Sequence, residues 1–524
     1  MRPSPEKPRP DPIALRDGKI IYSETGSFTL LPSETIQRAE KVLQKIGVVS
    51  VEQIDPKYTD GVPIFKLNEA PAKARCHRQA CYWSFPPTLL NNPPRESFGK
   101  GMTVEQSKAS AMMEAVERFC GQKFPHHQVI QATYEDVRYY AIPLSKFNFP
   151  LPPPKCENCG EKDWDCFADL QKVCQEWSWG YSLTHRRPVL IPAALVYYPY
   201  ISKDYTSFMY NDTGGLSAGN TIEEAILQGI AEVIERDALY FAFNLGNLKD
   251  KPILDFRCSK NRYIQKFIRD ILPPERVFSF QIKNETLNLA IPTFTAFVCY
   301  LTENGPCYFG GSGTSLDPEV GLLRALTELE QQKIRQKFFV AFDPNQLVTH
   351  NNPGPRNTFF LGEKSNQSTG NVKQDIELLL GQLLKEGMDV IVVDLTHPEI
   401  GIPVVRVIIP QLISYSGSPI KESLLKGVMM SFGAGAFPDG WRPYHQGIPS
   451  ANSTKESSHL VVPEKPVRLQ RVQREEAEIH WGDETGLSNG GSQGRSYAPQ
   501  GETPAVRVCV RKENHGSICL PKPE

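Results

Sequence analysis

The sequence predicts an α+β fold, in which strands and long helices form α/β layers around a large core. Hydrophobic residues make up 40% of the 524-residue chain and charged residues 22%, a balance typical of globular proteins. Apolar, strand-like runs alternate along the chain with segments of helical periodicity, as they do in layered domains. A chain of this length can bury a large core.

Charge and hydropathy exclude several classes of protein. The formal net charge is −1, so no global basic field attracts nucleic acid or an anionic membrane. No apolar run reaches the ~18 residues of a transmembrane helix, and the N-terminal MRPSPEKPRPDP lacks the apolar core of a signal peptide. Without an export signal, the twelve cysteines indicate thiols or metal ligands. We therefore expect a cytoplasmic protein that binds neither nucleic acid nor membrane.

Local signals place the first elements. Residues 1–29 are polar and proline-rich at their start and are expected to be a disordered lead-in. The following LPSETIQRAEKVLQKIG predicts a helix with a cap near Ser33 or Thr35 and a stop at Gly47. Apolar runs predict strands at residues 188–200, 289–300, 390–395 and 404–409.

Two segments lack a regular pattern. Residues 430–524, which include SNGGSQGRSYAPQGET, are expected to be a low-complexity, largely disordered tail, and a partner-binding tail is the alternative. Residues 150–180 are expected to be an insertion that contains cysteines at irregular spacing. Zinc binding is one hypothesis for these cysteines, and loose thiols are the other. The four cysteines are Cys156, Cys159, Cys166 and Cys174.

An ungapped internal repeat carries the functional argument. GMTVEQSKASAMMEAVER at residues 101–118 aligns with GNTIEEAILQGIAEVIER at residues 219–236, with Gly, Thr, Glu and Arg in register. A looser third copy, SLDPEVGLLRALTELEQ, occupies residues 315–331. The recurrence indicates that one supersecondary unit is used three times.

Each copy begins like a helix and follows a glycine-rich segment. Thr103 and Thr221 start capping boxes, and Asp317 precedes a proline at the first helical position. Glycine lets backbone N–H groups approach a phosphate, and a helix N-terminus favours an anion. The glycine-rich segments lie at residues 99–101, 214–219 and 310–313.

The three predicted helices share one polar face. The residues seven, eleven and fourteen positions after each cap lie on one side of a helix. The remaining circumference is mostly apolar, which indicates burial. The polar residues are Ser110, Glu114 and Glu117 in the first copy, Gln228, Glu232 and Glu235 in the second, and Arg324, Glu328 and Gln331 in the third.

Carboxylates on buried faces need compensation. Two carboxylates about 4 Å apart repel by roughly 4 kcal/mol at an effective dielectric constant near 20, which is large against the stability of a fold. They must be protonated or share a cation. Acids from several helices, with an arginine and amides between them, suit Mg²⁺ and a triphosphate. Solvated faces or structural ion pairs are the alternative, which the threefold recurrence of the spacing disfavours.

The three copies resemble the ATP-binding segments of the YcaO family. That family shows GKG before a helix of the form SAxxEAxER, then AGNTxxEAxxxGxxExxER, and later DPEVALLRALTEAxQ. This chain has SAMMEAVER from Ser110, AGNT from Ala218 and DPEV from Asp317. Weaker similarity covers residues 30–412. The resemblance implies a YcaO-type fold with mixed β-sheets packed by long helices around a central ATP and magnesium site, in a catalytic domain at residues 30–429.

The resemblance also assigns roles by position. It implies magnesium ligands at Glu114, Glu117, Glu232 and Glu235, with Glu224 and Glu328 as further candidates close by. It implies ATP contacts at Thr35, Lys100, Ser110, Asn220, Gln228, Arg236, Arg324 and Gln331. An exposed, uninvolved lysine is the alternative for Lys100.

The reaction that the resemblance implies is ATP-dependent activation of a peptide backbone amide by phosphorylation of its oxygen. The attacking group is a thiol, hydroxyl, amine or sulfide. Such chemistry needs metal-held phosphates more than a protein nucleophile, and the sequence indicates no catalytic residue. Two departures from the family pattern are Gly214-Gly215 in place of a frequent Asn-Gly and a C-terminal PKPE that does not match PxPxP.

Within the family, residues 30–412 look closest to the methanogenesis-marker group. That group implies thioamide formation on a protein such as methyl-coenzyme M reductase, with a TfuA-like partner for sulfur delivery. Two alternatives stay open, namely an azoline-forming cyclodehydratase acting on a ribosomal peptide and a non-catalytic partner that presents peptides. A peptide or protein substrate is expected in each case, and a homodimer is compatible with the sequence.

Overall fold

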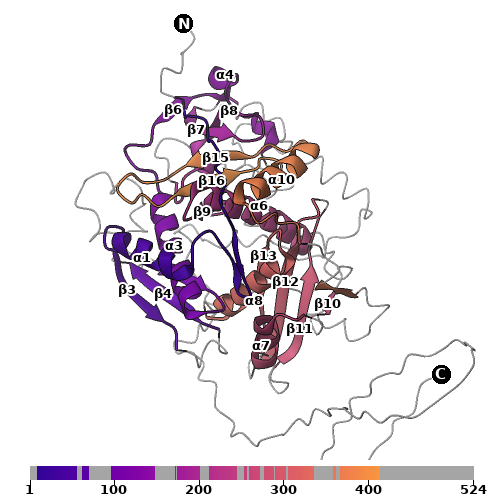
Figure 1. Ribbon diagram of the computed structural model, residues 1–524. Coiled ribbons are helices and arrows are strands. Elements are labelled where there is room, and N and C mark those ends of the chain that lie inside the picture. Colours follow the sequence, from indigo (N-terminus) through magenta and orange to yellow (C-terminus); the bar gives the residue numbers. More distant parts are fainter. Residues whose placement is uncertain are drawn as a thin grey trace, which may run out of the picture. The chain divides into compact units, whose positions relative to one another are not determined.

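Three strand–helix units make up most of the described part of the chain (Figure 1). The chain divides into two units, Met1–Phe437 and Pro438–Glu524, and every described residue belongs to the first. Within the described ranges, no helix combines the length and apolar character needed to span a membrane. The computed structural model describes residues 9–55, 62–69, 96–147, 171–172, 174–200, 212–244, 253–255, 259–271, 277–287, 289–302, 305–334, 358–361 and 366–412.

The first unit is a three-stranded antiparallel sheet covered by two helices. The sheet has the order β3 (Val48–Gln53), β4 (Ile64–Glu69) and β5 (Glu96–Lys100). Helices α1 (Pro32–Leu43) and α3 (Val104–Cys120) contact each other, and α3 packs on β4 and β5. Small and flexible apolar residues on α3, such as Ala111 and Met112, are buried in this contact.

The second unit is a larger antiparallel sheet. Its order is β6 (Val129–Ala132), β7 (Gln175–Ser182), β15 (Ile391–Asp394), β16 (Val404–Ile408) and β9 (Leu216–Ala218), and β8 (Arg187–Pro192) also pairs with β7. Helix α6 (Ile222–Asn244) packs on β9 and β16, and α10 (Val372–Lys385) packs on α6. Three short helical segments complete this region: α4 (Tyr134–Val137), η4 (Leu144–Lys146) and η5 (Ala193–Leu195).

The third unit is a five-stranded mixed sheet. Its order is β13 (Gly305–Thr314), β12 (Thr293–Thr302), β11 (Val277–Asn284), β10 (Ile253–Asp255) and β14 (Thr358–Phe360). Only the β10–β14 pair among these is parallel. Helix α8 (Pro318–Ile334) packs on β12 and β13, and α7 (Arg262–Ile271) lies in the same part of the chain. The predicted α+β class is confirmed.

The three repeat helices are α3, α6 and α8, and each contacts the strand that precedes the next helix. Helix α3 contacts β9, α6 contacts β13 and α8 contacts β5. Since β5, β9 and β13 lead directly into α3, α6 and α8, these contacts close a ring. The helices therefore converge although their first residues, Val104, Ile222 and Pro318, lie 118 and 96 residues apart in the chain (Figure 1).

The glycines before the helices permit close packing of strand on helix. A Cβ atom on Gly99 would lie 2.1 Å from both the Ser107 oxygen and the Ala111 nitrogen. A Cβ on Gly311 would lie 2.1 Å from the Leu329 nitrogen. These glycines bring strand and helix backbones together, a role that the sequence pattern alone does not distinguish from an approach to phosphate.

The expected disordered lead-in is wrong for residues 9–29. Strands β1 (Ile21–Ser23) and β2 (Gly26–Phe28) form a hairpin there, and the Ile20 N–H donates to the Gly370 carbonyl at 2.9 Å. Ile20 is buried in the core beside α6 and α10, and Ile13 and Leu15 pack against the same cluster. A few widely spaced apolar anchors hold this segment, so no periodicity revealed it. Residues 1–8 lie outside the described ranges.

Two predicted boundaries shift. Helix α1 has Leu31 as its N-cap, so it begins before Ser33 and Thr35, because Pro32 suits the first helical position and the Glu34 side chain accepts the Leu31 N–H at 2.9 Å. The helix ends at Leu43 with Gln44 as its C-cap, before the predicted stop at Gly47, which has a φ of 84° in the turn that follows.

The predicted strands also differ at their ends. The 188–200 strand ends at Pro192, where the 3₁₀ turn η5 follows, and the 289–300 strand begins at Thr293 and extends to Thr302. The strands at 390–395 and 404–409 are confirmed as β15 and β16.

Replacing Gly99 by alanine tests the close packing of β5 on α3. The added Cβ meets backbone atoms that cannot rotate away, so we expect a loss of about 1–3 kcal/mol in the free energy of unfolding. Gly381→Ala on α10 is the matched control, because nothing lies within 4 Å of its Cβ and alanine favours a helix. Denaturant unfolding compares the two variants, and equal or greater stability of Gly99→Ala would contradict the packing role.

Candidate functional site

The first acid group joins α3 to α6 and consists of Glu114, Glu117 and Glu232. Burial, together with repulsion from Glu232 and Glu114, raises the pKa of Glu117 well above its ordinary value. Burial also raises the pKa of Glu232. Carboxylates from two helices thus crowd together in a poorly solvated region, as the sequence pattern predicts.

Arginines one helical turn away compensate part of this charge. The Arg118 Nε donates to Glu114 Oε1 at 2.8 Å, and the Arg236 Nη2 donates to Glu232 Oε1 at 3.2 Å. Both glutamate side chains are only 19% exposed. The Arg236 side chain is half-buried, and the charges of Glu232 and Glu235 outweigh its desolvation and raise its pKa. Glu117 accepts a hydrogen bond from the backbone N–H of Ala218, and the charge of Arg118 also acts on it.

The second acid group joins α6 to α8 and consists of Glu235 and Glu328. Burial and the charge of Glu328 raise the pKa of Glu235, whose Oε1 accepts the Ser312 hydroxyl at 2.7 Å. Burial alone would also raise the pKa of Glu328. The positive charges of Lys100 and Arg236 outweigh this effect and hold the pKa of Glu328 below its ordinary value.

Lys100 extends from β5 into this group. Its Nζ lies 2.5 Å from Glu328 Oε2. Lys100 is therefore engaged with an acid of another unit, 228 residues away in the chain, and the alternative of an uninvolved surface lysine does not describe it.

A polar cluster lies at the beginning of α6. The Asn220 Nδ2 donates to the Thr35 hydroxyl at 3.0 Å, and the Asn220 N–H donates to Glu224 Oε2 at 2.6 Å. The Thr29 hydroxyl also donates to Glu224 Oε2 at 2.6 Å. The Glu224 side chain thus caps the N-terminus of α6. Glu224 lies eight residues before Glu232, which corresponds to about 12 Å along the helix axis. The structure does not bring it into either acid group.

Strand β5 lies between α3 and α8 and is bonded to both. The Phe98 N–H donates to Glu114 Oε2 at 3.2 Å, and the Phe98 carbonyl accepts from Gln331 Nε2 at 2.8 Å. The Lys100 N–H donates to the Ser110 hydroxyl at 3.4 Å. These bonds fix the positions of three predicted site residues.

The remaining two predicted residues occupy the space between the groups. The half-buried Arg324 guanidinium faces the charges of Glu235, Glu232 and Glu224, and desolvation lowers its pKa. Gln228 is half-buried on α6 between Glu224 and Glu232.

Sequence reasoning missed several contributors. Thr29 and Ser312 bind glutamates through hydroxyl groups that no pattern marks. Arg38 of α1 donates to the carbonyl of Asn220 at 2.5 Å. Arg406 on β16 is 4% exposed and faces Glu232 and Glu117. Only Arg406 had a visible signal, because it interrupts the apolar run VVRVII.

The donor set fits Mg²⁺ together with a nucleotide. Among the described residues, no three carboxylate, imidazole or thiol groups lie close enough to hold a metal ion by themselves. Magnesium is usually held by one or two carboxylates and completes its shell with phosphate oxygens and water, so glutamates that meet in small groups suit it. The buried Asn220 Oδ1 has no hydrogen-bond partner within the described residues, so one acceptor in this region is unsatisfied.

The zinc hypothesis stays a prediction without support. Cys156, Cys159 and Cys166 lie outside the described residues, and Cys174 is exposed.

A family model described as YcaO cyclodehydratase, ATP- and Mg²⁺-binding, matches residues 98–413. The chain belongs to the YcaO family. An uncharacterized protein of Methanothermobacter thermautotrophicus is 30% identical over 409 residues, which cover 74% of this chain and 95% of that protein. An uncharacterized protein in the tfuA 3′ region of Rhizobium leguminosarum is 25% identical over 354 residues, 62% of this chain and 78% of that protein.

Solved structures confirm the YcaO-type fold. A heterocyclase in complex with substrate and cofactor superposes with a TM-score of 0.64 at 22% identity, over 81% of this chain. This chain spans 57% of the length of that heterocyclase. The YcaO protein of Methanopyrus kandleri bound with AMPPCP and Mg²⁺ superposes with a TM-score of 0.52 at 23% identity, over 76% of this chain and 95% of that one.

Family membership places the chain in a class of ATP-dependent, peptide-modifying enzymes that bind Mg²⁺. The expected cofactors ATP and Mg²⁺ are confirmed at the level of the family. The roles of the individual site residues stay predictions, and so do the bounds of the catalytic domain, the disordered tail and the cytoplasmic location.

Replacing Glu117 by glutamine tests the repulsion within the first acid group. The raised pKa of Glu117 means that its contribution to stability is complete below the ordinary carboxyl value of 4.5 and is lost as the pH rises through the folded-state pKa. Glutamine mimics the protonated acid, so the metal-free variant should melt at a higher temperature than the wild type well above that pKa. The two should converge below pH 4.5.

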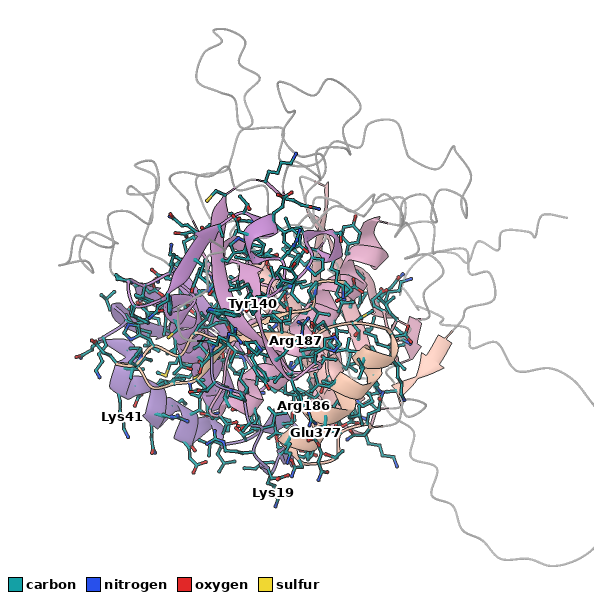
Figure 2. All side chains as sticks on the ribbon, turned by 90° about the horizontal axis from the view of Figure 1, so that it is seen from above. Lys19, Lys41, Tyr140, Arg186, Arg187 and Glu377 are labelled. Atoms are coloured by element: carbon teal, nitrogen blue, oxygen red, sulfur yellow. The ribbon has the colours of Figure 1, made fainter. Side chains whose placement is uncertain are left out.

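Thermal unfolding without divalent ions measures this difference across pH. Glu377→Gln, at an exposed position of α10 labelled in Figure 2, is the control and should show no such trend. Glu117→Gln melting below the wild type at every pH would contradict the repulsion.

Proposed function

We propose that this YcaO enzyme uses ATP to activate a peptide backbone amide by phosphorylating its oxygen, and that it converts the amide of a protein substrate into a thioamide. Two observations support the proposal. The mutual repulsion of buried glutamates from three helices suits a site for Mg²⁺ and phosphates. The Rhizobium relative is named for its position in a tfuA 3′ region, which favours sulfur as the attacking atom.

The proposed reaction balances without a redox partner. Hydrosulfide adds to the carbonyl carbon of the amide, and the resulting oxyanion takes the γ-phosphoryl group of ATP, releasing ADP. The C–O bond then breaks, phosphate leaves with the amide oxygen, and loss of the sulfur proton completes the C=S bond. Amide, hydrosulfide and ATP thus become thioamide, ADP and phosphate. No protein nucleophile is required, in keeping with the family.

We assign the residue roles by charge. The first and second acid groups would hold Mg²⁺, which when bound offsets phosphate charge during phosphoryl transfer. Arg236, Arg324 and Lys100 supply fixed positive charge beside these acids. Asn220 and Thr35, bonded to each other at the start of α6, would contact the nucleotide together with Ser110, Gln228 and Gln331.

A TfuA-like protein is the proposed sulfur-delivery partner. The methanogenesis-marker resemblance and the name of the Rhizobium relative both favour it. A protein such as methyl-coenzyme M reductase is the proposed substrate class, because the same resemblance implies it. The acid groups act on ATP, which the azoline-forming reaction shares, so they do not distinguish sulfide from a side-chain nucleophile.

Glu232→Gln tests the metal assignment. Glu232 belongs to the first acid group, so its neutral analogue should lower peptide-dependent ATP hydrolysis by at least the ~100-fold that the loss of a metal's supporting partner can cost. Phosphate release in the presence of candidate peptide and Mg²⁺ measures the effect. Glu377→Gln should keep wild-type turnover. Full activity of Glu232→Gln would overturn the assignment.

Mass spectrometry of the product tests the attacking atom. Purified enzyme, ATP, Mg²⁺, sulfide and a candidate substrate peptide should give a mass gain equal to the exchange of one oxygen for one sulfur. Loss of one water from a peptide containing cysteine or serine would instead assign azoline formation. ATP-dependent binding of peptide without either change would favour a peptide-presenting role.

A further inference from the structure

Arg406 is an unusual residue for its position. It lies in the middle of β16, paired with Val393 of β15 on one side and with Leu216 of β9 on the other. Its neighbours on the same face of the strand are Val404 and Ile408, both in the main hydrophobic core. An apolar residue would avoid the desolvation of a buried guanidinium, so the charge itself needs an explanation.

The guanidinium binds the segment that leads into α6. Nη1 donates to the Asp212 carbonyl at 2.8 Å, and Nη2 lies 3.3 Å from Asp212 Oδ1. The same Asp212 Oδ1 accepts the Gly214 N–H at 2.9 Å. Arg406 therefore clamps both the backbone and the side chain of Asp212, which in turn shapes the turn that follows.

Strand β16 holds the rest of this segment at two further points. The Val407 N–H donates to the Gly215 carbonyl at 2.7 Å, and the Gly219 N–H donates to the Pro403 carbonyl at 3.0 Å. Gly215 has a φ of 78°, and a Cβ there would lie 2.2 Å from the Val407 carbonyl oxygen, so no larger residue fits. Residues 212–219 form one strip on β16, and Arg406 anchors its first residue.

This strip touches the proposed magnesium ligands and the proposed nucleotide contacts. The Ala218 N–H bonds to Glu117, and Asn220 follows directly at the start of α6. The Arg406 charge also faces Glu232 and Glu117. The Arg406 side chain thus binds the first residue of the strip and also places a positive charge near the first acid group.

We propose that Arg406 is a positioning residue of the nucleotide site, which clamps residues 212–219 through Asp212 and supplies the buried positive charge opposite Glu117 and Glu232. The inference deepens the proposed function and rests on it. Arg406 holds the residues that surround the ligands and takes no direct part in the reaction. A lysine provides a point charge but cannot grip two Asp212 oxygens in one plane, so shape as well as charge matters.

Two variants separate these contributions. Arg406→Lys keeps the charge and loses the two-point grip. Asp212→Asn keeps an acceptor for the Gly214 N–H and removes the ion pair. Arg187→Lys, at an exposed position on β8 of the same sheet and labelled in Figure 2, is the matched control.

Hydrogen exchange of the metal-free, full-length protein is the first measurement. The amides of Gly214, Leu216 and Gly219 should exchange faster in Arg406→Lys and Asp212→Asn than in wild type, while the amides of α10 should not change. Unchanged exchange at 214–219 in both variants overturns the proposal, whether or not the enzyme binds ATP.

Calorimetric titration with AMPPCP and Mg²⁺ is the second measurement. Both variants should bind about tenfold more weakly, the effect typical of a lost supporting contact, and Arg187→Lys should bind as wild type does. Turnover should show the loss mainly in the KM for ATP. Wild-type affinity in both variants overturns the inference and leaves the proposed function intact. Failure of the wild type to bind AMPPCP and Mg²⁺ instead overturns the proposed function.

Discussion

Repulsion between buried glutamates is the constraint on which the rest of this structure depends. Glu117 lies between the charges of Glu114 and Glu232, and Glu235 lies beside Glu328. The repulsions of Glu117 with Glu232 and of Glu235 with Glu328 each act between two helices and oppose their approach. Neighbouring arginines and a lysine offset part of the repulsion, and burial together with the remaining repulsion raises the pKa values of Glu117 and Glu235. In the proposed function, a divalent cation offsets the negative charge of these glutamates.

The architecture keeps these charges together. Each of the three repeat helices contacts the strand that leads into the next one, so no helix can move away without breaking a neighbouring unit. Gly99 and Gly311 allow the strand backbone to contact the helix backbone directly, at α3 and at α8, so these helices are closely packed on their strands. Rigid strand–helix contacts therefore oppose the electrostatic force that would separate the acidic faces, and the site is preorganised before any ligand binds.

The site accounts for the use of ATP, which members of this family share. It does not set the attacking group, which distinguishes them. The acid groups and their arginines are proposed to act on ATP, and a heterocyclase with only 22% identity has the same fold. In the proposed reaction, any attacking group adds to the same backbone amide and the same phosphoryl transfer follows. Substrate and partner recognition therefore has to decide the identity of the attacking group. The proposed sulfur chemistry accordingly rests on the tfuA neighbourhood of a relative, whereas the proposed phosphoryl transfer rests on the geometry of the glutamates.

The sequence by itself determined the three helices, their caps and their acidic faces. Thr103 accepts the Gln106 N–H at 3.1 Å and Asp317 accepts the Glu319 N–H at 2.9 Å, as the local patterns predict. Periodicity reports one face of one element, so it could not say which glutamates meet across helices. Tertiary structure alone decided that Lys100 pairs with Glu328 and that Glu224 is occupied at a helix start, because such contacts depend on packing between segments distant in the chain. It also decided that sparse apolar anchors order residues 9–29.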